Sequence, residues 1–475
     1  MFLPIDNTSE WSASLFEHAK LGDKRLTNRL IQVADQVSSN IGDSLSKSCN
    51  GDEALLEGGY RFLRNNKVKA NYIAAAGYDS TARIALESKL LLAIDDSTSV
   101  VYRHEASKTL GYTTNKVDAK SRGFMVHSTI LLDASSEKTL GLISQNRWCR
   151  AKSDYGKRNS RSKLPYKEKE SYKWERNSRD TAARLGDQIS NTISVCDREA
   201  DIFEYIQYKL SNNQRFIVRA CQNRVLSTNT TLFKHLTCQA KLGTYEIEIA
   251  QKANRKKRTA LLELTTSSVS FVPPKRYNKQ DEPLEEITLN VVRAKEVTDD
   301  LDNALEWVLL TAEDVTTFTK ARQITRYYEL RWRIEDFHKA WKSGTNVEKL
   351  RLQTVDNLEK MLVILSFVAI RLLQLKEYFE KEPVDKTKST EQQSCEGIVS
   401  TVQWKVLWRT IAKKALPTKP PSASWVYSAI AKLGGWTNSK RTGKASWATI
   451  WDGWFKLNER VSGFLLAKEM LETDL

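Results

Sequence analysis

Two short apolar runs, each followed at once by acidic residues, constrain the fold of this chain more than any other feature. Lys89–Ile94 is followed by Asp95 and Asp96, and Ile193–Cys196 is followed by Asp197. Continuous apolar runs of this length are typical of strands buried on both faces of a sheet. If both strands lie in one sheet and run in the same direction, the acids that follow them meet at one edge. The sequence therefore predicts an α/β fold with carboxylates gathered at a sheet edge.

The segments around these runs read as alternating strands and helices. Three sequential strands joined by short links predict an antiparallel meander, and a strand, a helix and a strand follow it. The predicted elements after the first run are strands at Phe124–Leu132 and Thr139–Trp148, a helix at Ser178–Ile189, the second run, a helix near Ile202–Asn212 and a strand at Arg215–Cys221. Residues 222–312 are again rich in β-type sequence, with turn and charge clusters between the runs, and predict an antiparallel insertion.

A third candidate acid lies in Tyr328–Lys342, YELRWRIEDFHKAWK. This stretch has no Pro or Gly and predicts a helix of about four turns. At about 100° per residue, one face of that helix holds five polar side chains: Tyr328, Arg331, Glu335, His338 and Lys342. One carboxylate among cations and a phenol suits a site that handles phosphate. Taken alone, the stretch is explained more simply by an exposed amphipathic helix with ion pairs.

Carboxylates from these three contexts are a known solution for phosphodiester chemistry. Asp96, Asp197 and Glu335 would repel one another unless hard cations neutralise them, and Mg²⁺ prefers oxygen ligands of this kind. Two ions close together would activate a water or a 3′-hydroxyl and stabilise the leaving oxygen. On the helix, Asp336 competes with Glu335, but only Glu335 shares the face of Arg331.

The two aspartates are not fixed by pattern alone. A strand-terminal Asp is very often a turn or cap residue. Alternation does not choose between Asp95 and Asp96, because the run before them is apolar throughout. Glu199 and Asp201 compete with Asp197 as cap and first-turn acids.

The charge of the chain indicates a polyanionic partner. The formal net charge is +16 and the pI is about 9.3, which favours nucleic acid first and an anionic membrane surface second. No apolar run approaches the roughly 20 residues that span a bilayer, and the first residues lack the features of a secretory signal. The six cysteines are scattered and the five histidines are not paired at ligand spacing, so neither a zinc cluster nor a disulfide framework is indicated. We expect a cytosolic, reduced protein with no membrane partner.

Residues 1–67 predict a small helical unit that could dock DNA. A helix at Glu53–Arg64 follows Asp52, a plausible N-cap. The candidate DNA contacts are Arg25, Arg29 and Arg61, although the sequence shows no clean helix-turn-helix pattern.

Two further segments carry an alternative each. The basic stretch Arg147–Lys173 is either a DNA contact or an exposed flexible loop. In the helical, tryptophan-rich residues 397–475, Trp447, Trp451 and Trp454 form one apolar face, which Leu465 continues among others. That face is either part of an internal core or a dimer seam.

These residues together give the chain a resemblance to the bacterial cut-and-paste DDE transposases of the insertion-sequence-four family, over essentially its whole length. The most specific mark is the family's Tyr-x2-Arg-x3-Glu-x6-Lys signature, present here as Tyr328, Arg331, Glu335 and Lys342. The flanking RWRIEDFHKAWK also matches closely, and Trp332 within it is a further candidate DNA contact.

Two more segments carry the resemblance. LLAIDDSTS is similar to the segment that holds the family's first catalytic aspartate, which falls on Asp96, and VCDREADI to the segment that holds the second, on Asp197. In the family a tryptophan from the insertion holds a base flipped out at the transposon end. Trp307 occupies the matching position, where a core tryptophan on a strand is the alternative.

The resemblance implies a fold and an activity. The expected fold is a ribonuclease-H-like core, a mixed five-stranded sheet with helices, interrupted by a β insertion at about 222–312. The expected domains are a helical end-binding domain at 1–67, the catalytic domain at 68–376, and a linker with a helical dimerisation domain at 377–475. We expect each active site to hold two Mg²⁺ ions, with Mn²⁺ able to substitute, on Asp96, Asp197 and Glu335.

The implied partners are the transposon's terminal inverted repeats, target DNA and a second copy of the chain in a synaptic complex. Each copy would cut its end through a hairpin intermediate and join the 3′ end to target DNA in the bacterial cytoplasm, bound to the nucleoid. The alternatives are a metal-dependent nuclease or resolvase of the same fold, and a DNA-binding protein with a silent acidic cluster.

Overall fold

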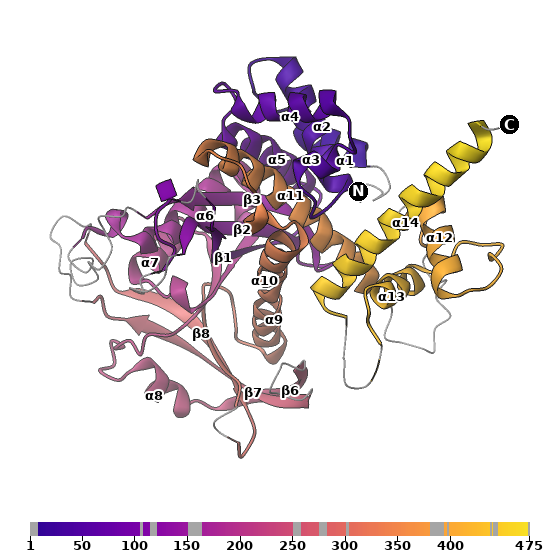
Figure 1. The fold of residues 1–475 in the computed structure, drawn as a ribbon. Coiled ribbons are helices and arrows are strands. Elements are labelled where there is room, and N and C mark those ends of the chain that lie inside the picture. Colours follow the sequence, from indigo (N-terminus) through magenta and orange to yellow (C-terminus); the bar gives the residue numbers. More distant parts are fainter. Residues whose placement is uncertain are drawn as a thin grey trace. The chain divides into compact units, whose positions relative to one another are not determined.

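The computed structural model describes residues 8–104, 108–114, 121–150, 164–249, 258–274, 283–300, 304–380, 394–396, 399–437, 439 and 445–473 (Figure 1). The chain forms two compact units, one of Thr81–Glu335 and the other of Met1–Ser80 together with Asp336–Leu475. The middle of the basic stretch, residues 151–163, lies outside the described residues, as do residues 381–393 of the linker predicted at 380–396.

A nine-stranded sheet runs through the unit Thr81–Glu335, in the strand order β3-β2-β1-β4-β5-β9-β8-β7-β6. Its strands are β1 (Leu91–Tyr102), β2 (Arg122–Asp133), β3 (Lys138–Trp148), β4 (Thr192–Cys196), β5 (Arg215–Arg219), β6 (Lys241–Ile249), β7 (Arg258–Phe271), β8 (Ile287–Glu296) and β9 (Glu306–Thr311).

The first five strands form a mixed sheet, as the order of elements in the sequence predicts. β1, β2 and β3 pair antiparallel, which confirms the meander. β4 is parallel to β1, and β5 is parallel to β4. Parallel neighbours need a crossover connection, and the helices α6 (Lys173–Leu185) and α7 (Phe203–Ser211) supply the two crossovers. α6 packs against β2 and β3, and α7 packs against β5.

Strand β1 extends beyond the predicted run. β2 pairs with β1 along its whole length, so Asp95 and Asp96 lie inside the strand. β4 pairs with β1 only as far as Ile94, which lies opposite Val195. The expectation that both acids follow the end of the first strand is therefore wrong. Asp95 and Asp96 lie instead in the middle of β1, beside the end of β4.

The predicted β insertion is present but does not form a separate layer. β6, β7, β8 and β9 pair antiparallel with one another. β9 then pairs antiparallel with β5, with Ile217 opposite Thr311, so the insertion continues the core sheet. The expectation of five strands is wrong, because an open edge such as that of β5 can accept a further strand. A short helix, α8 (Leu232–Thr237), packs against β7.

The predicted helix Tyr328–Lys342 is not continuous. Helix α9 (Phe318–Glu329) ends before a tight turn, in which the Arg331 N–H donates to the Tyr328 carbonyl at 3.0 Å. Helix α10 (Trp332–Lys339) follows, and Ala340–Gly344 then widens into a π-helix. π-Helical turns inside helices are often found at functional sites. The even helical spacing assumed from the sequence is therefore wrong.

The other unit, Met1–Ser80 with Asp336–Leu475, is helical. Its helices are α1 (Thr8–Phe16), α2 (Lys24–Ser39), α3 (Leu45–Ser48), α4 (Glu53–Arg64), α5 (Ala70–Ala85, which runs past Ser80), α11 (Val355–Glu380), α12 (Thr401–Ile411), α13 (Ala423–Leu433) and α14 (Trp447–Thr473). α11 packs against α2, α4 and the π-helix, and its buried Lys360 donates to the Leu63 carbonyl at the end of α4 at 2.8 Å. No helix in the described ranges is long and apolar enough to span a membrane.

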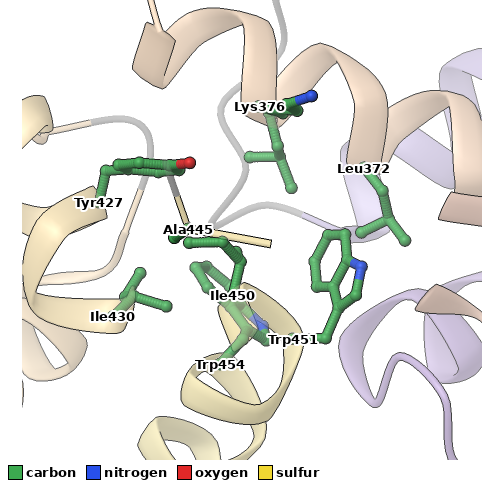
Figure 2. A pocket seen from close by; sticks show the side chains of 9 residues that line it. Leu372, Lys376, Tyr427, Ile430, Ala445, Ile450, Trp451 and Trp454 are labelled. Carbon is green, nitrogen blue, oxygen red and sulfur yellow. The ribbon is translucent and has the colours of Figure 1, made fainter. Parts of the chain in front are cut away.

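The apolar face predicted for helix α14 is buried at one end and exposed at the other. Trp451, Trp454 and Leu457 are buried in the core of this unit. Trp451 and Trp454 also line a cavity of about 20 Å³ between α11, α13 and α14 (Figure 2), which is room for one water molecule. Further along, five apolar side chains are exposed: Phe464, Leu465, Leu466, Met470 and Leu471. Of these five only Leu465 continues the predicted face, so the first part of that face is internal core and its continuation at Leu465 is exposed.

Candidate active site

Strand alternation places the two adjacent acids of β1 on opposite faces of the sheet. Asp95 is buried on the face covered by α6, where Thr129 and Asn177 donate to it. The Asp96 side chain is 19% exposed and lies on the other face, where its Oδ2 is 3.6 Å from the Arg331 guanidinium. The structure thus separates two residues that the sequence leaves equivalent.

The second acid lies directly after β4. Asp197 caps the short 3₁₀ turn Arg198–Ala200, and its Oδ1 accepts the Glu199 N–H at 2.8 Å. Its two competitors have other partners. Asp201 is buried in an ion pair of 2.5 Å with Arg224. Glu199 is exposed and pairs with Lys173 at 3.2 Å.

Arg331 connects the third acid to the first. Its guanidinium lies 2.5 Å from Glu335 Oε1 on α10 and 3.6 Å from Asp96 on β1. The Arg331 side chain is only 13% exposed, so solvent screens these pairs weakly. Asp336, the competitor of Glu335, pairs with Lys376 at 2.8 Å within the other unit.

The electrostatics show that the three acids act on one another. The pKa of Asp96 is raised to about 7, chiefly by burial and then by the charge of Asp197. The Ser97 N–H and Arg331 oppose this rise, and Glu335 adds to it. Burial also raises the pKa of Asp197, while Arg331 is among the groups that oppose the rise. Like charges held together in a poorly solvated place favour the protonated form, and Arg331 partly relieves that repulsion.

The donor chemistry of this cluster suits a hard divalent cation. Asp96, Asp197 and Glu335 offer only carboxylate oxygens, the ligands that Mg²⁺ and Mn²⁺ accept. Within the described residues, no group of three or more His, Cys, Asp or Glu side chains is already arranged around one ion position. In this structure Arg331 supplies the positive charge between Asp96 and Glu335.

Aromatic side chains lie beside the acids. Trp307 on β9 meets Tyr328 edge to face, with 5.5 Å between ring centroids. Tyr328 is 5% exposed, and burial raises the pKa of its phenol while Arg219 and Arg331 oppose the rise. Trp332 is 45% exposed and lies 5.9 Å from the Arg331 guanidinium carbon. A partly exposed ring next to cations can stack on a base.

The remaining predicted residues belong to the other compact unit. Lys342 lies in the π-helix, where burial lowers the pKa of its ammonium group. Arg25 is exposed on α2, and Arg29 lies across Gly58 of α4, so close that a Cβ at Gly58 would collide with its guanidinium. Arg61 on α4 is exposed and pairs with Glu57 at 3.0 Å.

Two cations that the sequence did not single out lie near the acids. Lys173 opposes the rise in the pKa of Asp197, and it lines an open cavity of about 600 Å³ together with Arg198 and Trp174. Arg219 ends β5, where it donates to the Glu306 carbonyl at 3.1 Å. Arg219 could have been predicted from the sequence as a site residue, because it ends a strand that runs parallel to β4. Lys173 could not, because it is one of many cations in the basic stretch.

Two protein-family models match the chain. The model of the transposase DNA-binding domain matches residues 8–68, and the model of the transposase DDE domain matches residues 172–372. Together they cover just over half of the chain, and the second range contains Asp197 and Glu335 but not Asp96. The chain therefore carries the DNA-binding domain and the DDE domain of a transposase. A DDE domain implies a ribonuclease-H-like core and chemistry that depends on divalent metal ions.

One solved structure similar to the chain is a cryo-EM structure of the piggyBac transposase synaptic complex with hairpin DNA. The sequence identity is 9%, and the match covers 84% of this chain and 88% of that chain, with a TM-score of 0.36. A TM-score of this size is too low to establish a common fold.

Proposed function

We propose that this protein is a cut-and-paste DNA transposase of the insertion-sequence-four family, closest to the transposase of the transposon "Tn five". It would bind the terminal inverted repeats of its element, cleave there and join the 3′ ends to target DNA. The observation that carries this proposal is that Asp96, Asp197 and Glu335 interact through Arg331 in a chain with both transposase domains.

We assign the metal site to Asp96, Asp197 and Glu335. When bound there, two Mg²⁺ ions, or Mn²⁺ in their place, would activate the attacking oxygen and stabilise the leaving oxygen of an in-line displacement. The carboxylates would hold the ions, and the poorly solvated setting of Asp96 would strengthen its interaction with them.

Cations and aromatic side chains around the acids would bind the DNA. Arg331 is largely shielded from solvent between carboxylates and can offer its planar donors to phosphate oxygens. Lys342, in the other unit, would bind phosphate through its ammonium. Tyr328 would donate a further hydrogen bond. Trp307 and Trp332 would stack on bases, Trp307 on a base flipped out when the 3′-hydroxyl forms the hairpin.

The flanking regions would bind the element's ends and pair two protomers. In the domain 1–67, Arg25, Arg29 and Arg61 lie on α2 and α4, inside the range of the DNA-binding model. The domain 377–475 would form the homodimer, because the last part of α14 exposes five large apolar side chains. Large exposed apolar side chains gathered at one end of a helix are typical of an interaction site. The complex would act on DNA in the bacterial cytoplasm.

The test is DNA cleavage at the element's ends by purified protein with Mg²⁺. We expect Asp96→Ala, Asp197→Ala and Glu335→Ala each to abolish cleavage, while end binding in a gel-shift assay persists. Asp336→Asn is the matched control, because Asp336 is adjacent to Glu335 but pairs with Lys376. Retained cleavage in any alanine variant would remove that residue from the site, and retained cleavage in all three would remove the proposed site.

A further inference from the structure

Behind the candidate active site, the first acid of β1 is the centre of a buried hydrogen-bond network. Asp95 is 4% exposed, and its Oδ1 accepts hydrogen bonds from Thr129 on β2 and from Asn177 on α6, the latter at 3.1 Å. Asn177 is itself fixed, because its Oδ1 accepts from Ser144 at 2.6 Å and from Asn146 at 2.8 Å, both on β3. One oxygen of Asp95 is therefore anchored to two strands and a helix.

The second oxygen of Asp95 reaches across to the parallel strand. The Cys196 thiol donates to Asp95 Oδ2, with 3.7 Å between sulfur and oxygen. The backbone pairing of β1 with β4 ends one residue earlier, at Ile94 and Val195. The side-chain contact thus continues the link between the strands beyond their last paired residues. Asp96 and Asp197 are the next residues along the chain, Asp96 within β1 and Asp197 directly after β4.

We propose that Asp95, through its hydrogen bond with Cys196, is a positioning residue that fixes the spacing of the Asp96 and Asp197 carboxylates for metal binding. This rests on the proposed function, which makes those two residues metal ligands. Asp95 itself touches neither metal nor DNA, because it lies on the opposite face of the sheet. Contacts that fix the positions of metal ligands, without touching the metal, commonly change the affinity for the metal strongly.

A buried charge needs compensation, and the network provides it. The ammonium of Lys209, also fully buried, attracts the Asp95 carboxylate. Lys209 is held by Ser194 at 2.8 Å and by Gln214 at 3.0 Å. Removing Asp95 would leave Lys209 without this charge, so Asp95→Ala risks general loss of folding. Cys196 offers a milder change, since its replacement leaves the bonds of Asp95 to Thr129 and Asn177 in place.

The experiment compares three variants of the full-length protein: Cys196→Ala, Cys196→Ser and Ser144→Ala. Binding of Mn²⁺ to protein without DNA is measured by electron paramagnetic resonance, and thermal unfolding is followed in parallel. We expect Cys196→Ala to weaken Mn²⁺ binding about tenfold. Cys196→Ser keeps a donor for Asp95 and should stay within about twofold of wild type. Ser144→Ala removes an equally buried bond that does not link β1 to β4, and should also stay within about twofold.

Wild-type Mn²⁺ affinity in Cys196→Ala would overturn the inference, as would an equal loss in Ser144→Ala at the same melting temperature. The outcome is separate from that of the proposed function. If wild-type protein binds Mn²⁺ with the expected order of variants but does not cleave DNA, the proposed function fails and the positioning role stands. If DNA is cleaved and joined but the three variants bind Mn²⁺ alike, the positioning role fails alone.

Discussion

Replacing Asp96 by Asn should stabilise the metal-free protein at alkaline pH. The pKa of Asp96 in the folded protein is raised to about 7 from its ordinary value of 3.8. Between these values the folded state binds more protons than the unfolded state, so the free energy of unfolding falls as pH rises from about 4 to 7. A difference of about three pH units corresponds to roughly 4 kcal/mol as an upper limit at pH 8. Asn carries no charge and avoids this loss.

The assay is thermal unfolding in EDTA between pH 5 and 8.5. We expect Asp96→Asn to melt on the order of 5 °C higher than wild type at pH 8, and the difference to shrink towards pH 5. Asp201→Asn is the matched control and should destabilise the protein, because it weakens the buried partner of Arg224. No gain for Asp96→Asn at pH 8, or an equal gain at pH 5 and pH 8, would refute the reasoning.

Three further predictions concern the neighbouring groups. Arg331→Ala should lower the melting temperature in EDTA at pH 8, because it leaves two partly buried carboxylates without their cation. Mg²⁺ should restore part of the loss in a thermal shift assay, and a variant whose melting temperature does not respond to Mg²⁺ would contradict this. Trp307→Ala should slow hairpin formation about 10-fold to 100-fold on an end nicked in one strand, whose free 3′-hydroxyl attacks the opposite strand and releases the flanking DNA. Trp307→Phe should lie in between, as loss of base stacking predicts, and equal rates would show that Trp307 only packs in the core. Replacing both Leu466 and Leu471 by Asp should abolish dimers in sedimentation on end DNA without lowering the melting temperature, since both side chains are exposed; unchanged dimers would place the interface elsewhere.

The sequence predicts the strands of the core well, because each is an apolar run closed by polar or turn residues. It does not choose between Asp95 and Asp96. The preceding residues of β1 are buried on both faces, so the alternation that would distinguish the faces is missing. Asp96 is distinguished from Asp95 because α6 covers the face of Asp95 and Arg331 lies on the face of Asp96. Both contacts join segments far apart in the sequence, so local patterns do not predict them.

Two errors have a similar origin. The turn at Leu330 and Arg331 interrupts a stretch that has no Pro or Gly, so no local signal marks it. The number of strands was wrong because pairing of β9 with β5 joins residues 217 and 311, far apart in the chain. Periodicity finds the strands of an insertion but does not show which open edge they join.

The most direct test of the account is a strand-transfer assay with DNA ends taken from the inverted repeats that flank the coding sequence. Precut ends, a supercoiled target plasmid, Mg²⁺ and wild-type protein should give joined products, and Asp96→Ala, Asp197→Ala and Glu335→Ala should give none. Cleavage of uncut ends without any joining of precut ends would show a nuclease or resolvase and contradict the account.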